Sequence, residues 1–180
     1  MPLIVFPIAA LAQDQPDMQK LMEIGTPGPN HKLLQQFVGK WDVEVWYKMG
    51  TMEGRSKAAC EIKPVHEGRY FLADYKSEMM GQPFFVQQTF GYDNLRKKFF
   101  EFQIESDNTG YVFYTGSASA DGKRYEFSTD SFDPMTMKPA KLRIVKQWLD
   151  KDKFVIEWYM TKAGEKEQKV VTLTHTRSNG

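Results

Sequence analysis

From residue 39 onward, apolar and polar side chains alternate with a period of two, which is typical of half-buried β-strands. The stretch WDVEVWY shows this clearly, with Trp41, Val43 and Val45 on one face. Clusters of glycine, proline, aspartate and asparagine interrupt the alternation at short intervals, as turns do. The interruptions predict about ten strands. These span residues 41–48, 54–63, 68–78, 83–92, 97–105, 111–119, 123–131, 140–149, 153–161 and 167–176.

The connections between these strands are too short for the crossover that a parallel pair requires, so neighbouring strands should be antiparallel. No helical pattern lies between them, which excludes a fold built from β-α-β units. Such a series forms either a closed barrel or a sandwich of two sheets. We favour the barrel because closure leaves no unpaired strand edge. The sequence therefore predicts an all-β domain over residues 39–180, a closed antiparallel β-barrel of about ten strands.

A different period precedes the strands. Apolar residues recur every three to four positions in residues 14–24, which predicts a helix that ends at Gly25. The same period predicts a second, short helix over residues 31–38, with Asn30 as its N-cap. Residues 13–38 would then form a helical segment ahead of the first strand. We expect this segment to cap the barrel floor.

The chain starts with an apolar run, LIVFPIAALA, that is too short to span a bilayer. The run ends in small residues, Ala10 and Ala12, which resemble a cleavage site, although the basic start of a signal peptide is missing. We interpret residues 1–12 as a signal peptide with a short or truncated start. The mature chain would begin near Gln13 and work in the periplasm or outside the cell. The alternative is a cytoplasmic protein with a disordered or strand-like N-terminus.

Composition excludes several classes of partner and site. The formal net charge is +1, so no overall field draws the chain to nucleic acid. Cys60 is the single cysteine, which excludes an intramolecular disulfide, and the three histidines lack the spacing of a metal site. We expect His31 and His66 to be surface or capping residues, while His175 could act as a ligand or base. Local motifs for a nucleophile, a phosphate loop or a dinucleotide are missing, so we expect no cofactor and no metal.

The start of the first strand resembles a known barrel signature. Gly39-Lys40-Trp41, after a short helix, is similar to the Gly-x-Trp of lipocalin-like (calycin) barrels. The resemblance implies that Trp41 lies across the barrel floor and that a basic residue after the last strand packs on its indole ring. Arg177 in THTR matches that residue. Such a contact contributes about 0.5–2 kcal/mol and would join the two ends of the barrel.

A second resemblance covers nearly the whole chain after the apolar run. It rests on the order of the segments MQKLMEIGTPGPNHKLL, VGKWDVEV, GRYFLADYKSEMMGQPF, FGYDNLRKKF, DPMTMKPAKLR and THTR. These resemble an uncharacterised bacterial family, domain of unknown function 1579, whose members often carry export signals. The family has no settled activity, so it implies a fold and leaves the function open. This chain departs from the family pattern at Gln103-Ile104-Glu105 and at Met137, so a site built there would be altered.

Polar residues stand alone within apolar strands, and a buried charge costs several kcal/mol unless it is paired. Arg143 and Glu157 lie on consecutive predicted strands, where they could pair. We expect them to form a polar anchor inside an aromatic-walled lumen, and an ordinary surface ion pair is the alternative. The predicted ligand-binding residues are Arg143, Glu157, Lys169, Tyr75, Tyr159 and Tyr47.

Three functions fit these features. The first is non-catalytic binding of a small, partly apolar molecule of unknown identity in the barrel lumen, with no stable membrane insertion. The second is an enzyme that uses a lumen carboxylate, Glu157 or Glu101, as a general base beside Arg143. The third is a barrel filled by its own side chains that forms a homodimer through exposed aromatic residues such as Trp46. The volume and lining of the lumen would distinguish them.

Overall fold

The computed structural model describes residues 15–79 and 81–178. Two helices and a 3-10 turn come first: α1 spans Gln15–Gly25, α2 spans Pro29–Leu34 and η1 spans Gln35–Phe37. The strands are β1 (Gly39–Met49), β2 (Met52–Val65), β3 (Tyr70–Met79), β4 (Gln82–Asp93), β5 (Lys98–Glu105), β6 (Val112–Ala118), β7 (Arg124–Phe132), β8 (Pro139–Asp150), β9 (Lys153–Lys162) and β10 (Gln168–Arg177). The 3-10 turn η2 (His66–Gly68) joins β2 to β3. The interpretation of residues 1–12 as a signal peptide falls outside the described residues.

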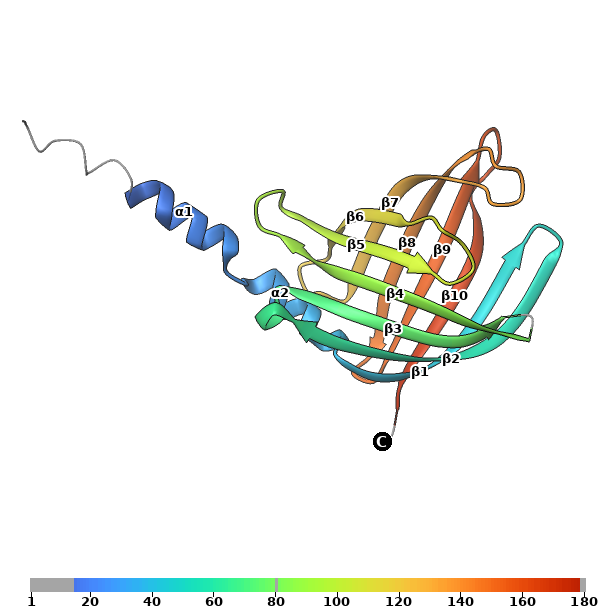
Figure 1. Ribbon diagram of the computed structural model, residues 1–180, viewed down its shortest axis with the longest axis horizontal. Helices are drawn as coiled ribbons and strands as arrows, with labels where there is room; N and C mark the ends of the chain where they lie inside the picture. The colour runs from blue at the N-terminus through green and yellow to red at the C-terminus, as the bar shows by residue number, and fades with distance from the viewer. Residues whose placement is uncertain (1–14, 80, 179–180) are drawn as a thin grey trace, which may run out of the picture.

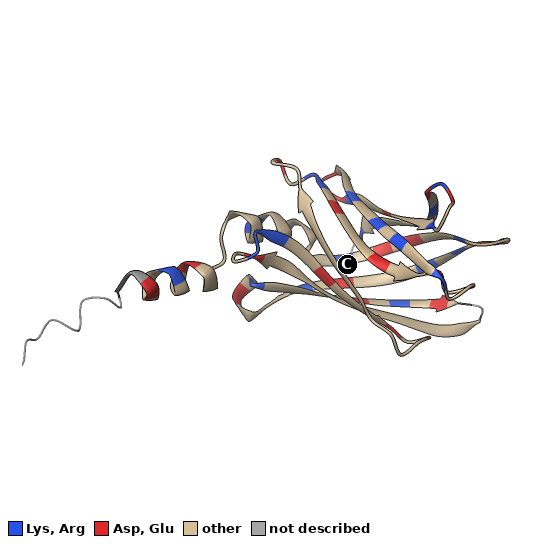
Figure 2. Cartoon of the chain, turned by 90° about the horizontal axis from the view of Figure 1, so that it is seen from above, with Lys and Arg blue, Asp and Glu red and all other residues tan. Residues whose placement is uncertain are grey.

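The strands form one closed antiparallel barrel in which each strand pairs with its neighbours in sequence (Figure 1). β1 closes the ring against β10, and at this seam Trp41 lies opposite Arg177. Each predicted strand overlaps one observed strand, so the prediction of a closed antiparallel barrel is confirmed. Basic and acidic residues are interspersed over the strands, in keeping with the balanced net charge (Figure 2). Among the described residues, no helix is long and apolar enough to cross a bilayer.

Alternation along each strand separates an inner face from an outer one. The core fills the end of the barrel where β1 begins, and its largest members are aromatic. Trp41, Phe71 and Phe154 are at most 1% exposed there. Tight aromatic packing of this kind contributes a large share of the burial energy of a small barrel.

The segment α2–η1 closes that end. Phe37 inserts its ring among core aromatics and lies 5.1 Å, between ring centroids, from both Trp148 and Phe154. α2 begins at Pro29, not at His31 as predicted, because the imidazole Nδ1 of His31 accepts the backbone N–H of Gly28 at 3.1 Å. His31 is therefore a capping residue, which is one of the two roles expected for it, and it is buried.

α1 does not take part in the cap. It extends away from the barrel (Figure 1), and the side chains of Met18, Leu21 and Met22 are more than half exposed. Its C-terminal end is held by Asn94, whose side-chain amide donates to the carbonyls of Ile24 and Thr26. Only the second half of the predicted helical segment, α2 with η1, therefore covers the floor.

The contact predicted between the two ends of the barrel is present. The guanidinium carbon of Arg177 lies 4.2 Å from the centroid of the Trp41 ring, and the Arg177 Nη1 donates to the carbonyl of Val38 at 3.1 Å. Gly39 adopts a φ of +140°, and a Cβ there would lie 2.6 Å from the same nitrogen. A glycine is required at this position because any side chain would displace the arginine.

Candidate functional site

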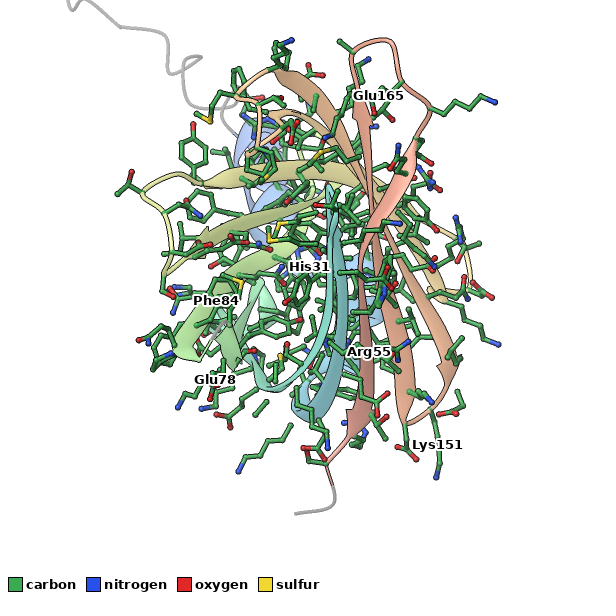
Figure 3. All side chains as sticks on the ribbon, turned by 90° about the vertical axis from the view of Figure 1, so that its right-hand side faces the viewer. His31, Arg55, Glu78, Phe84, Lys151 and Glu165 are labelled. Carbon is green, nitrogen blue, oxygen red and sulfur yellow. The ribbon has the colours of Figure 1, made fainter. Side chains whose placement is uncertain are left out.

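The inner wall differs between the two halves of the barrel. Toward the floor the inner-face side chains are buried, but in the other half Val45, Trp158, Met160 and Leu173 are only partly buried. Solvent therefore reaches the inner wall from the end that carries the β1–β2 and β3–β4 hairpins. Figure 3 shows the side of the barrel to which the β1–β2 and β3–β4 hairpins point, with Arg55 and Glu78 labelled. A ligand that enters the lumen would meet this half first.

A buried ion pair lies near the boundary between the two halves. The Nζ of Lys146 on β8 contacts the Oε1 of Glu101 on β5, and their side chains are 6% and 2% exposed. β5 and β8 are not neighbours, so the pair crosses the barrel interior. The ammonium also lies 5.1 Å from the ring centroid of Phe90 and 5.7 Å from those of Phe37 and Phe127. Carboxylate and aromatic faces together compensate the desolvation of this cation.

A chain of side-chain amides runs beside this pair along β4 and β5. The Nε2 of Gln88 donates to the Oε1 of Gln103, and the Nε2 of Gln103 donates to the Oε1 of Glu105. Both glutamines are buried. Burial raises the pKa of the Glu105 carboxyl, while the hydrogen bond from Gln103 opposes that rise. The wall of the lumen thus carries a continuous polar strip.

Three buried polar atoms on this wall have no hydrogen-bond partner among the described residues. They are the Oε1 of Gln88, the Oε2 of Glu101 and the Oη of Tyr114. Gln88, Glu101 and Tyr114 are at most 4% exposed. Burial raises the pKa of Tyr114, and the charges of Glu101 and Glu105 raise it further, so the phenol keeps its proton. Buried polar atoms without partners are rare in folded proteins and often mark a place where a ligand or water binds.

A second cluster lies nearer the floor. The Oη of Tyr75 lies 3.1 Å from the Nε2 of His175, whose ring stacks on Phe154 at 4.1 Å between centroids. Burial, with a smaller contribution from the charge of Lys146, lowers the pKa of His175 to about 3. Burial also raises the pKa of the Cys60 thiol to about 12. At neutral pH the imidazole is uncharged and the thiol is protonated, which makes both weak participants in acid–base or nucleophilic chemistry.

Four of the predicted ligand-binding residues lie on the outer face. Arg143 does not pair with Glu157; its guanidinium binds the carboxylate of Glu167 at 2.6 Å and that of Glu126 at 3.3 Å. Glu157 accepts from the Nζ of Lys169 at 2.9 Å and from the Oη of Tyr159 at 2.8 Å. The prediction that Arg143 and Glu157 form an anchor inside the lumen is therefore wrong.

Tyr75 and Tyr47 lie on the inner face, as predicted. Tyr75 is buried in the floor half, whereas Tyr47 lies over Gly54 near the open end, where a Cβ at the glycine would collide with the phenol. Lys146 is the residue that sequence reasoning missed as an anchor. Leu142, Ile144 and Lys146 share one face of β8, but the buried Val145 on the other face weakens this signal in the sequence.

Two solvent-open hollows occur on the described surface. One, of about 610 Å³, lies against β2, β3 and β4, and the other, of about 620 Å³, lies against β10, β1 and β2. Each is lined by consecutive residues of its strands, such as Glu44, Val45 and Trp46. Because consecutive residues of a strand point to opposite faces, neither hollow is lined by inner-face side chains alone. Neither contains Gln88, Glu101 or Lys146. Within residues 15–79 and 81–178, no cluster of three or more histidine, cysteine or acidic side chains has the geometry of a metal site.

The family described as "Protein of unknown function (DUF1579)" has a model that matches residues 26–177, so the chain belongs to this family. The resemblance seen in the sequence is confirmed. No curated protein matches the chain.

Solved structures resemble the barrel. The crystal structure of Rv2717c from M. tuberculosis superposes with a TM-score of 0.62 at 14% identity, covering 86% of this chain and 100% of that one. This likeness shows the fold alone. The redesigned β-barrel b11L5F_LGL gives a TM-score of 0.40 at 12% identity and covers 83% of this chain and 96% of its own. EF1p2_mFAP2b, solved bound to DFHBI, gives 0.44 at 10% identity over 83% of this chain and 99% of its own.

Proposed function

We propose that the barrel binds a small, partly apolar molecule in its lumen and does not transform it. The observation that carries this proposal is the group of unpartnered, buried polar atoms at the boundary of the solvent-reached half. Apolar walls with a few convergent polar groups are the usual form of a small-molecule site. The buried Glu101–Lys146 pair adds charged groups to the same wall, and a buried pair of this kind is weak evidence for a purely stabilising role.

The groups that an enzyme would need are poorly placed. Glu157 lies on the outer face, and the hydrogen bond from Lys169 lowers its pKa, which weakens it as a base. Glu101, the other candidate base, is paired with Lys146. Arg143 pairs with neither Glu101 nor Glu157 and binds Glu167 instead. The proposal of binding without catalysis follows from this placement.

Adjacent alanines on β2 allow a matched test. Ala58 packs against the core on the inner face, whereas Ala59 is exposed on the outer face. The fluorescent probe N-phenyl-1-naphthylamine, which is uncharged and apolar, would be titrated into the full chain. We expect saturable binding to the wild type, loss of binding in Ala58→Trp because the indole fills the lumen, and unchanged binding in Ala59→Trp.

Native mass spectrometry of protein purified from its own host provides a second readout of a retained small molecule. The proposal fails if the wild type neither binds the probe saturably nor retains any small molecule. Equal loss of probe binding in both tryptophan variants would also count against it, because the probe would then not be in the lumen.

A dimer is the second candidate function, and a different surface favours it. Trp46 is not the exposed aromatic it was expected to be, since it is only partly exposed and its Nε1 donates to Glu53 at 2.9 Å. The outer faces of β4, β5 and β6 instead expose large apolar side chains. These are Phe85, Phe102, Ile104 and Phe113, which are 38–50% exposed. Patches of this kind often mark interfaces.

Sedimentation velocity tests the dimer directly. If this face associates, the wild type will show a concentration-dependent dimer, and Phe113→Asp will shift it to monomer. A monomer at all concentrations would remove this candidate. Thr161→Asp serves as the control, because Thr161 lies on the outer face of β9, opposite Lys141 and away from β4, β5 and β6.

A further inference from the structure

We propose that the ligand is an uncharged molecule whose polar end donates hydrogen bonds, such as an alcohol or an amide on an apolar body. The lumen would discriminate against the corresponding carboxylate. This inference rests on the proposed function and names the chemical class of its ligand. It comes from the direction of the hydrogen bonds on the β4–β6 wall.

The amide chain has a direction. The carboxylate of Glu105 accepts only, so Gln103 must turn its Nε2 toward it. The Oε1 of Gln103 then faces Gln88, which must offer its own Nε2. The one atom left at the end of the chain is the Oε1 of Gln88, a buried acceptor without a partner among the described residues.

The ion pair ends in an acceptor as well. Lys146 contacts the Oε1 of Glu101, and its ammonium is otherwise surrounded by the faces of three phenylalanine rings. The Oε2 of Glu101 has no partner in the described part of the chain. The cation is thus covered by aromatic rings and its carboxylate, and the atom available to a ligand is a carboxylate oxygen.

These acceptors lie close together on the inner face of β4, β5 and β6. On the inner face, Gln88 is opposite Gln103, and Glu101, two residues before Gln103, is opposite Tyr114. The Tyr114 ring lies 6.0 Å from that of Trp158, which is part of the solvent-reached half. A polar end at this place would therefore meet two acceptors and one hydroxyl, while its apolar body packs against Trp158.

The charges around this wall disfavour an anion. His175 is neutral because burial holds its pKa at about 3, and the Glu101–Lys146 pair carries no net charge. The other cation close to the interior, Arg177, lies against Trp41 at the floor and pairs with Asp152. A ligand carboxylate would face the oxygens of Gln88 and Glu101, and a single hydrogen bond from the Tyr114 hydroxyl would not offset the loss of its hydration.

Calorimetric titration at pH 7 with three ligands that share an eight-carbon apolar body tests the inference. The ligands are 1-octanol, octyl methyl ether and octanoate. The alcohol donates a hydrogen bond, the ether only accepts, and octanoate is an anion. We expect octanol to bind about tenfold tighter than the ether, in line with one hydrogen bond to a buried acceptor, and octanoate to bind weakest. Gln88→Leu should bring octanol and the ether close to equal affinity.

Gln87→Leu is the matched control, because Gln87 lies on the outer face and donates to Asp74 at 2.9 Å. It should leave the preference for octanol unchanged. Tyr114→Phe provides a second test if Gln88→Leu does not fold, and it should reduce the preference in part. Equal binding of octanol and the ether to the wild type, or tightest binding of octanoate, overturns the inference and leaves lumen binding standing. If none of the three ligands binds while the naphthylamine probe does, the inference is likewise overturned. If the probe also fails and no small molecule is retained by the protein from its own host, the proposed function falls with it.

Discussion

Removing one partner of the Glu101–Lys146 pair should be far more damaging than removing both. The single variant Lys146→Met leaves the Glu101 carboxylate inside the barrel without its cation. Both side chains are at least 94% buried, so the remaining charge is poorly hydrated. Leaving a buried charge uncompensated costs about 3–5 kcal/mol, which is a large part of the stability of an ordinary domain.

The double variant Lys146→Met/Glu101→Met removes both charges and fills the same space with apolar side chains. Replacing a buried ion pair in this way is often neutral, so we expect a change of less than about 1 kcal/mol relative to the wild type. The pair Lys63–Glu61 is the control, since its side chains are 61% and 41% exposed. Lys63→Met should cost less than about 1 kcal/mol, as surface pairs do.

Urea unfolding at pH 7, followed by tryptophan fluorescence, measures these differences from the midpoint at constant slope. The reasoning predicts the order of stability: wild type close to the double variant, and both well above Lys146→Met. A loss below about 1 kcal/mol in the single variant would show that the carboxylate is hydrated. A double variant less stable than Lys146→Met would show that the unpaired carboxylate is not what destabilises the single variant.

Three further predictions concern the floor. Trp41→Leu and Arg177→Met should each lower the free energy of unfolding. The double variant should lose about 0.5–2 kcal/mol less than the sum of the two single losses, because the two side chains contact each other. Additive losses in urea unfolding would reject this contact. Burial lowers the folded pKa of His175 from 6.5 to about 3, so the unfolded chain binds the extra proton and stability falls as pH drops below about 6.5. Between pH 8 and pH 5 this loss approaches about 2 kcal/mol in the wild type, and a His175→Phe variant with the same pH slope would contradict it. Because burial raises the pKa of Cys60 to about 12, a thiol reagent at pH 8 should label it only as fast as the chain unfolds; rapid labelling of the folded protein would refute this.

Local patterns were sufficient for the strands and for the floor. Alternation and turn residues are properties of neighbouring positions, so each strand could be placed from its own few residues. The contact between Trp41 and Arg177 joins the two ends of the barrel, yet it too was predicted, because the resemblance to lipocalin-like barrels identified both residues. The exposed position of α1 could not be predicted, since its spacing of apolar residues is the same as that of a packed helix.

Whether Arg143 or Lys146 is the polar residue inside the lumen depends on which side chains of β8 point inward. The sequence of β8 leaves this ambiguous. Ile144 and Val145 are both at most 3% exposed, although they lie on opposite faces. Val145 is on the outer face, and its neighbours across the pairs with β7 and β9, Glu126 and Glu157, have long side chains that can cover it. With both faces buried, alternation no longer distinguishes Arg143 from Lys146.

The sequence by itself determined the strands, their antiparallel order and the glycine, tryptophan and arginine of the floor, because these depend on local spacing or on a recognisable signature. Only the tertiary structure decided which polar side chains lie inside. Lys146 and Glu101 come from strands that are not neighbours, and closure of the barrel sets the distance between them. A contact of that kind leaves no pattern along the chain, so the candidate site became visible only in the folded protein.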